Sequence, residues 1–137
     1  MISSSIVSKS SVLLTLLIVG FMTALIIESS QPPLPLLGFL DGFDKIAHFL
    51  AFAFLNLLIC TLFLKVSNKE KVPLFSTPLL ITSLFGIIEE SYQTFIPTRT
   101  SSLYDLLADI LGAIFAILIA NQINAAIHRK SKKIKHE

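Results

Sequence analysis

The sequence of 137 residues has no tryptophan, a single cysteine and few charged residues, which make up 15% of the chain. Because Cys60 is alone, an intramolecular disulfide and a site built from several thiolates are excluded. The low charge, together with 53% hydrophobic residues and a positive mean hydropathy, is not typical of an ordinary soluble domain. The composition therefore predicts a membrane protein.

Four long stretches contain no Asp, Glu, Lys or Arg, and we interpret them as membrane-spanning helices. They are 16 to 19 residues long and cover 12–27, 46–64, 72–88 and 110–127. At a rise of about 1.5 Å per residue, each stretch with its flanks can cross a hydrocarbon core of about 30 Å. The sequence predicts one all-α domain over 1–137, a four-helix transmembrane bundle with spans at about 10–28, 44–64, 73–96 and 103–127, followed by a basic tail at 128–137.

Proline and small polar residues indicate where these helices begin and end. The prolines of QPPLPLLG, at 31–38, begin the first connection, because proline removes a backbone donor and fixes φ. Pro73 fits the first turn of the third helix, and Pro97 ends that helix. Residues 100–102 offer side-chain oxygens to cap the fourth helix. The segment ESSQPPLP has no small-x-small cleavage site, so we expect the first helix to be retained.

Lysine and arginine are concentrated on one side of the predicted membrane. Nine of them share that side: Lys9, Lys65, Lys69, Lys71, Arg129, Lys130, Lys132, Lys133 and Lys135. Only Lys45 and Arg99 lie on the other side. Because cytoplasmic flanks retain positive charge, we expect both termini to be cytoplasmic. The basic tail is typical of a topology and lipid-headgroup signal, so the expected contact is the bilayer and not nucleic acid.

In this topology, polar residues from three helices reach the outer level of the membrane. Residues three or four positions apart share one face of a helix. The resulting stripes are Asp44, His48, Phe52 and Asn56; Thr82, Gly86, Glu90 and Gln93; and Ser102, Asp105, Asp109, Gly112, Ala116 and Ala120. We expect each stripe to face the bundle interior, with the small residues allowing close helix approach. Arg99, in the outer turn, is expected to join Glu90 and Asp105, and Asn56 is expected to form an interhelical hydrogen bond.

Three segments of the chain resemble a known family. DKIAHFLAFAFLNLL, EESYQTFIPTR and SSLYDLLADILGA, found in this order over roughly Asp44 to Gly112, are similar to signature segments of the VanZ-like family of small bacterial membrane proteins. The resemblance implicates Asp44, Lys45, His48, Glu90, Gln93, Pro97, Arg99, Asp105 and Gly112. Asp109 stands where many members have asparagine, and Thr98 stands where glycine is frequent. The resemblance implies the bacterial cytoplasmic membrane and a link to glycopeptide resistance of the teicoplanin type.

The expected outer cluster has an excess of negative charge. Its carboxylates oppose only two cations, a formal net of minus three: Asp44, Glu89, Glu90, Asp105 and Asp109 against Lys45 and Arg99. A partly buried site cannot easily hold this imbalance, so a shared proton, a bound cation or contact with water must relieve it. Alternatively, Asp44, Lys45 and Glu89 are solvated helix flanks, while Glu90, Arg99 and Asp105 form a purely structural network.

Two functions follow from these alternatives. In the first, an outer pocket binds or acts on a cell-envelope amphiphile such as a lipid-linked intermediate, with phosphate bound by Lys45 and Arg99. The acid-base candidates are then His48, Glu90 and Asp105. In the second, the protein is a non-enzymatic scaffold for a partner, and the cluster only shapes the bundle. The full set of expected binding residues is Asp44, Lys45, His48, Glu90, Gln93, Arg99, Asp105 and Asp109. No cofactor and no particular metal is indicated, and a homo-oligomer is compatible with both functions.

Overall fold

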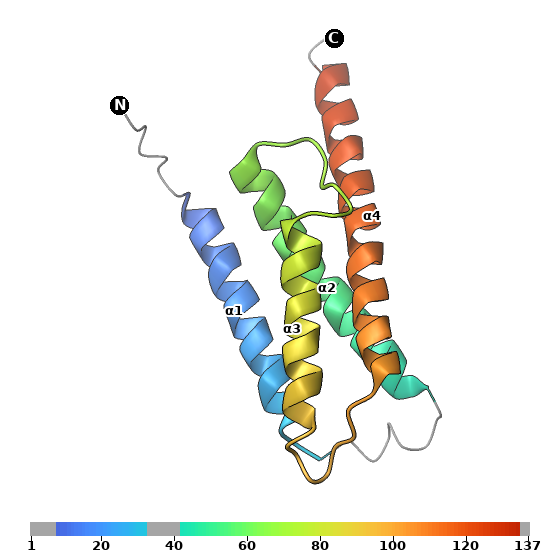
Figure 1. Ribbon diagram of the computed structural model, residues 1–137. Coiled ribbons are helices and arrows are strands. Elements are labelled where there is room, and N and C mark those ends of the chain that lie inside the picture. Colours follow the sequence, from blue (N-terminus) through green and yellow to red (C-terminus); the bar gives the residue numbers. More distant parts are fainter. Residues whose placement is uncertain (1–7, 33–41, 135–137) are drawn as a thin grey trace.

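The computed structural model describes residues 8–32 and 42–134, and this part of the chain is helical with short connections. Its helices are α1 (Lys9–Ser29), α2 (Phe43–Ser67), α3 (Thr77–Gln93) and α4 (Leu103–Ile134). Consecutive helices run in opposite directions, so the start of α1 and the end of α4 lie at the same end of the bundle (Figure 1). The all-α prediction is confirmed. Most of the predicted first connection, at 31–38, lies outside the described residues.

Polar caps and close turns fix where the helices begin. Ser8 caps α1 by accepting a hydrogen bond from the N–H of Ser11, and Gly42 precedes α2 with a φ of 91°, a left-handed conformation that glycine adopts without strain. The hydroxyl of Ser102 accepts a hydrogen bond from the N–H of Tyr104 at 3.2 Å. This bond confirms the capping role expected within residues 100–102.

The third helix begins later in the chain than the sequence predicts. It starts at Thr77 rather than near residue 73, and Pro78, not Pro73, occupies its first turn. The reason lies in Asn121 of α4, whose side chain accepts from the N–H of Val72 at 2.8 Å and donates to its carbonyl at 2.9 Å. The backbone around Val72 is thereby held against α4 in a connecting segment and is not used for a helical turn.

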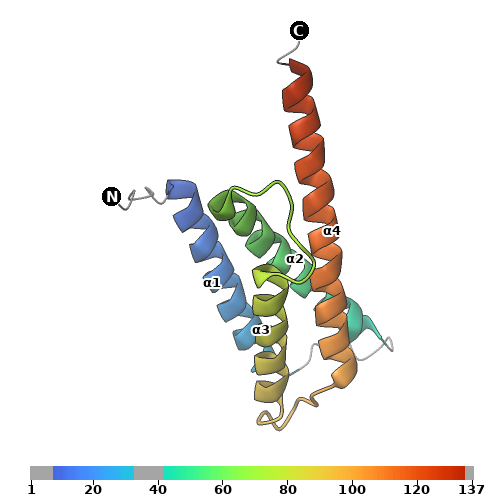
Figure 2. The ribbon, with the colours of Figure 1, turned by 45° about the horizontal axis from the view of Figure 1, so that its top comes forward.

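The fourth helix is longer than predicted. It does not end near residue 127 but continues to Ile134, and its last part extends beyond the other helices (Figure 2). The predicted basic tail at 128–137 is therefore helical as far as Ile134. The sequence there contains lysine and arginine, which favour helix, and no glycine or proline to end it.

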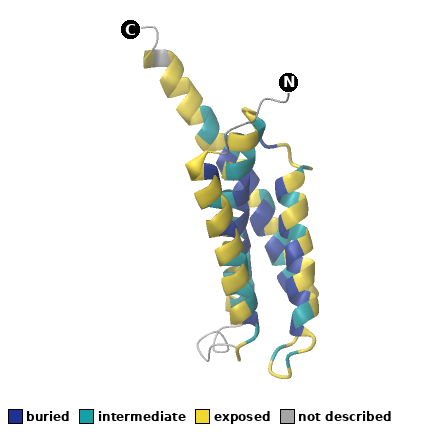
Figure 3. Cartoon of the chain, turned by 90° about the vertical axis from the view of Figure 1, so that its left-hand side faces the viewer, coloured by how far each residue is buried: buried dark blue, intermediate teal, exposed yellow. Residues whose placement is uncertain are grey.

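Three of the helices have the length and apolarity to cross a membrane: α1, α2 and α4. Large hydrophobic side chains such as Leu16, Leu50 and Leu118 are exposed on their outer faces. Figure 3 shows this arrangement, with buried residues toward the helix contacts and exposed ones outside. α3 has 17 residues, a length of about 26 Å at about 1.5 Å per residue, slightly less than a hydrocarbon core.

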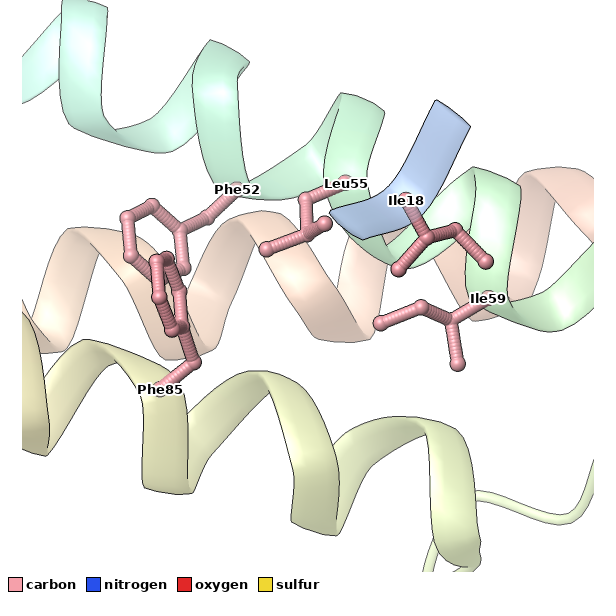
Figure 4. Close-up of a cluster of buried hydrophobic side chains, with 5 residues drawn as sticks. All are labelled: Ile18, Phe52, Leu55, Ile59 and Phe85. Carbon is pink, nitrogen blue, oxygen red and sulfur yellow. The ribbon is translucent and has the colours of Figure 1, made fainter. Parts of the chain in front are cut away.

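The bundle core is centred on α2, which packs against each of the other described helices. One buried cluster joins Ile18 of α1, three α2 residues and Phe85 of α3, as Figure 4 shows. Its α2 members are Phe52, Leu55 and Ile59. A second cluster lies nearer the end of the bundle at which α1 begins, and it includes Cys60, Val72, Ile117 and Ala120. Cys60 is fully buried and serves as a core residue.

The closest helix contact is the seam between α2 and α4. A Cβ atom placed on Gly112 would collide with the backbone carbonyl of Phe49 and lie 3.0 Å from the N atom of Ala53. Ala116 and Ala120 continue this buried face, which confirms the predicted small-residue stripe. Asn56 donates to the carbonyl of Ala113 at 2.6 Å, so the interhelical hydrogen bond predicted for this residue is also confirmed.

Candidate functional site

Three helix termini meet at the end of the bundle opposite the start of α1. They are the first turns of α2 and α4 and the last turns of α3, shown at the bottom of Figure 1. Asp44 lies in the first turn of α2 and Asp105 in the first turn of α4. Backbone N–H groups at a helix N-terminus stabilise negative charge, which explains how two carboxylates are tolerated there.

A salt bridge and a histidine–carboxylate hydrogen bond join α2 to α4. The Nζ atom of Lys45 lies 3.0 Å from Oδ1 of Asp105, and Nδ1 of His48 lies 3.0 Å from Oδ1 of Asp109. The first pair reaches solvent, because the Lys45 side chain is 43% exposed. The second is enclosed, with 11% of the His48 side chain and none of the Asp109 side chain exposed. Lys45 and His48 are three residues apart on α2, and Asp105 and Asp109 are four apart on α4, so the two pairs lie about one helical turn apart.

Glu90 brings α3 into the same site. Its Oε2 atom accepts a hydrogen bond from the N–H of Ser102 at 2.8 Å. Its Oε1 atom and Oδ2 of Asp109 are buried and have no hydrogen-bond partner among the described residues. Atoms that could coordinate a metal ion, one from each of His48, Glu90 and Asp109, all lie within 4.8 Å of one another, as do those of Asp44, His48 and Asp105. We call these six residues the polar cluster: Asp44, Lys45, His48, Glu90, Asp105 and Asp109.

The three predicted stripes do face the interior in this region. On α3, each of Thr82, Gly86, Glu90 and Gln93 is buried. On α4, Asp105 and Asp109 are 3% and 0% exposed. On α2, Phe52 and Asn56 are buried, whereas Asp44 and His48 are partly buried at the helix end. Spacing alone therefore predicts the facing side chains of all three helices.

Arg99 does not occupy the place that the sequence suggests. Its guanidinium lies 2.6 Å from the carboxylate of Glu28 and donates to the carbonyls of Glu28 and Gln31 at 2.9 and 2.8 Å. The expected direct link from Arg99 to Glu90 and Asp105 is therefore wrong. The physical reason is that the C-terminus of α1 presents unpaired carbonyls, which the several donors of arginine can satisfy together.

Gln93 and Glu89 also belong to this contact between α1 and α3. Glu89 is 2% exposed and accepts a hydrogen bond from the hydroxyl of Ser29. The side-chain amide of Gln93 donates to the same hydroxyl oxygen at 3.4 Å. The hydroxyls of Ser30 and Tyr92 lie 3.0 Å apart beside them. The interpretation of Glu89 as a solvated flank is wrong, because α1 covers it. We call Glu28, Ser29, Glu89, Gln93 and Arg99 the α1–α3 junction.

The sequence offered only weak signals for the α1–α3 junction. Glu28, Ser29 and Ser30 end an apolar helix, where polar residues normally face water or headgroups. Glu89 lies at the edge of the predicted α3 stripe. A hydrophobic helix that ends in polar side chains, opposite a second polar stripe, is the pattern that could have indicated the contact.

Hollows in the surface lie at both ends of the bundle. One of about 240 Å³ opens beside the polar cluster between α3 and α4, lined by Glu90, Ser91, Thr94, Ser101, Ser102, Leu103 and Leu106. A larger one of about 530 Å³ lies near the opposite end between α2 and α4, where Lys65, Lys69, Glu70, Asn124 and His128 contribute polar groups. Only the smaller hollow touches a carboxylate of the polar cluster.

The charge imbalance persists although Arg99 and Glu89 leave the group. The polar cluster sets four carboxylates against one lysine, a formal net of minus three while His48 is neutral. Its nitrogen and oxygen donors can hold a cation, an ammonium group or a shared proton. A bare anionic group is disfavoured, because the two cations assigned to phosphate, Lys45 and Arg99, already contact carboxylates.

The long apolar helices and their exposed hydrophobic faces define a multi-pass helical membrane protein. The sequence profile of the VanZ/LLP1 family matches residues 32–124, which include every residue of the polar cluster. The chain belongs to this family, and the resemblance seen in its sequence segments is confirmed. No curated protein and no solved structure gives a match to the chain.

Proposed function

We propose that this VanZ-like protein crosses the bacterial cytoplasmic membrane four times, with the polar cluster at the outer face. Lysine and arginine residues near the start of α1, the end of α2 and the end of α4 all belong to the opposite end of the bundle (Figure 1). This distribution supports a cytoplasmic location for that end. The short α3 reaches the outer surface through its connection to α4.

Cysteine labelling tests this topology. In a Cys60→Ala background, a membrane-impermeant maleimide applied from outside should modify cysteines placed at Gln31 or Thr100. Cysteines placed at Asn68 or Ser131 should react only after the membrane is opened. The opposite pattern would place the polar cluster in the cytoplasm and remove the outer amphiphile from consideration.

The function that the geometry supports best is binding of the headgroup of a cell-envelope amphiphile at this end of the bundle. The observation that carries the proposal is the pair of buried acceptor atoms without donors among the described residues, Oε1 of Glu90 and Oδ2 of Asp109, of which Glu90 also lines a hollow between α3 and α4. Buried acceptors normally have partners, so a ligand that donates hydrogen bonds suits them. The acyl chains of the ligand would contact the apolar outer faces of the helices.

The excess of carboxylates favours a headgroup that donates hydrogen bonds or carries a positive charge. Ammonium or amide N–H donors complement four carboxylates, and a phosphate would need a cation to bridge it. This revises the assignment of phosphate to Lys45 and Arg99. Binding is favoured over catalysis, with His48 and Glu90 as the acid-base candidates nearest the unpaired oxygens. A contribution to teicoplanin-type resistance would act through the same headgroup contact.

Co-purification tests the proposal. The full chain is isolated in mild detergent, and bound lipids are extracted and identified by mass spectrometry, in parallel with Glu90→Gln and with Glu70→Gln from the opposite end. We expect an envelope lipid with amine or amide groups in the parent and in Glu70→Gln, and a reduced amount in Glu90→Gln. Equal lipid content in all three proteins would contradict headgroup binding at the polar cluster.

A scaffold function is the second candidate, and the ion pairs favour it. Lys45 with Asp105 and Arg99 with Glu28 join helices without any ligand, as a purely structural polar group would. The exposed apolar faces could then contact another membrane protein or a second copy of the chain. Isolation of a stable complex, without a specific lipid, would support this function.

A further inference from the structure

We infer that His48, Glu90 and Asp109 bind a divalent transition-metal ion, with Zn²⁺ as the best fit. The three residues come from three different helices, α2, α3 and α4, and converge at one point of the bundle. The inference uses the same unpaired oxygens as the proposed headgroup contact, so at these atoms the metal and an N–H donor of a headgroup are alternatives, and bound metal and bound lipid are measured separately.

The unpaired oxygens of this group point to a ligand. Asp109 is fully buried, and Glu90 is 7% exposed. Yet one oxygen of each, Oδ2 of Asp109 and Oε1 of Glu90, has no partner among the described residues. An acidic cluster whose acceptors were all paired or hydrated would need no ion. Here two enclosed carboxylates and one imidazole supply more possible metal-ligand atoms than the surrounding protein pairs by hydrogen bonds.

The distances suit a small ion. Ligand atoms about 2.1 Å from a tetrahedral Zn²⁺ are about 3.4 Å from each other. Nδ1 of His48 and Oδ1 of Asp109 are already 3.0 Å apart, and donor atoms of all three residues lie within 4.8 Å. The Oε2 atom of Glu90 is oriented by the N–H of Ser102, which leaves Oε1 for the metal.

The competing set, Asp44, His48 and Asp105, is less suitable. Oδ1 of Asp105 already contacts the ammonium group of Lys45 at 3.0 Å, which satisfies its charge. Asp44 is only partly buried at the start of α2, where water competes with a metal. We therefore assign the ion to the deeper set, in which Asp109 is the most buried carboxylate.

The chemical types of the three ligand atoms indicate which metal ion suits the site. One imidazole nitrogen with two carboxylate oxygens suits Zn²⁺, with Mn²⁺ the nearest alternative. Ca²⁺ and Mg²⁺ prefer all-oxygen sites with more ligands, and soft Cu⁺ prefers sulfur. A doubly charged ion would also neutralise the two carboxylates of the set. Water would complete the coordination.

Metal binding by the purified full chain tests the inference. The protein, with any affinity tag removed, is treated with EDTA in detergent, dialysed, and titrated with Zn²⁺ and then Mn²⁺ by calorimetry, and bound metal is counted by mass spectrometry. We expect about one ion per chain and a rise in melting temperature on binding. Glu90→Gln and Asp109→Asn should weaken the affinity by about tenfold or more.

A matched control is Glu89→Gln. It removes a carboxylate that is equally buried and adjacent on α3, but this carboxylate contacts Ser29 of α1. Its Zn²⁺ affinity should fall much less than that of Glu90→Gln, because Glu89 contributes only a nearby charge and no ligand atom. Circular dichroism should show that all variants fold. If the folded parent binds neither ion, or if Glu89→Gln loses binding as much as Glu90→Gln, the inference is wrong. Metal without co-purifying lipid would retain the inference and remove the amphiphile.

Discussion

The polar cluster and the α1–α3 junction lie at the same end of the molecule, but they balance their polar groups differently. In the junction, Arg99 pairs with Glu28 and also satisfies the carbonyls that end α1. In the polar cluster, four carboxylates face a single lysine. The first arrangement completes the hydrogen bonds of a helix end, whereas the second leaves acceptors available.

Two neighbouring residues show the difference on a single helix. Glu89 and Glu90 are both buried, and each has one paired and one unpaired oxygen among the described residues. Glu89 accepts a hydrogen bond from the hydroxyl of Ser29 and has Gln93 nearby, whereas Glu90 accepts from the N–H of Ser102 and lies close to His48 and Asp109. The two buried carboxylates therefore differ in their surroundings more than in their burial, and the binding role proposed for Glu90 depends on this difference.

The largest effect is expected from separating α2 and α4, which hold most of the polar cluster. In Gly112→Ala, the new methyl group meets the Phe49 carbonyl, a backbone atom that cannot rotate away. We expect a loss of about 3 kcal/mol in the free energy of unfolding, measured by denaturation in detergent, together with loss of Zn²⁺ binding.

Gly20→Ala is the control for this prediction. A Cβ atom at Gly20 meets nothing within 4 Å, so the substitution should be neutral or stabilising by up to about 1 kcal/mol. If Gly112→Ala were as stable as Gly20→Ala, the close α2–α4 seam would not be what positions the polar cluster.

The next largest effect concerns the α1–α3 junction. Arg99→Ala removes three donor contacts, which leaves the carbonyl of Gln31 without the guanidinium, whereas the carbonyl of Glu28 keeps the N–H of Gln31 at 2.9 Å. We expect a loss of about 2 kcal/mol, mainly from the backbone acceptors, because Glu28 is itself 53% exposed and rehydrates. Thermal unfolding of the purified protein measures this change.

Arg129→Ala, on the part of α4 that extends beyond the bundle, is the matched control and should change stability little. Zn²⁺ affinity should be unchanged in both arginine variants, because neither residue belongs to the polar cluster. A loss of metal affinity in Arg99→Ala alone would show that the two regions are coupled, and it would contradict the independence of the polar cluster from the α1–α3 junction.

Much of this architecture is predictable from the sequence, because membrane helices and their facing stripes follow from spacing. The uncharged stretches indicate the helices, and the positions of Asp44, Glu90 and Asp105 on interior faces follow from the 3.6-residue period. The family resemblance identified the same residues. Asn56 was predictable in the same way, since a polar residue within an apolar helix needs a partner on another helix.

The partners of Arg99 and Glu89 were not predictable in this way. Periodicity gives the direction of a side chain but not which neighbouring helix covers it, and α1 carries no stripe that identifies its packing partner. The start of α3 depends on Asn121, a contact between segments distant in sequence. Such long-range hydrogen bonds override the local preference of Pro73 for a helix start.

The smallest effect on stability, and the most informative for binding, is expected from Lys45→Gln. The lysine side chain of the pair is 43% exposed but the Asp105 side chain only 4%, so loss of the pair should cost about 1 kcal/mol, more than a fully exposed salt bridge. Removing this positive charge makes the polar cluster more negative. Zn²⁺ should therefore bind more tightly, by on the order of 1 kcal/mol, as measured by titration calorimetry.

Lys65→Gln provides the comparison at the opposite end of the bundle, where an exposed lysine contacts Ser10. It should leave Zn²⁺ affinity unchanged, because its charge is far from the polar cluster and is screened by salt. Tighter binding in Lys45→Gln alone would confirm that the charge imbalance attracts the cation. Weaker binding in Lys45→Gln would instead mean that Lys45 positions the carboxylates, and the polar cluster would then resemble the α1–α3 junction in being held together by its own ion pairs.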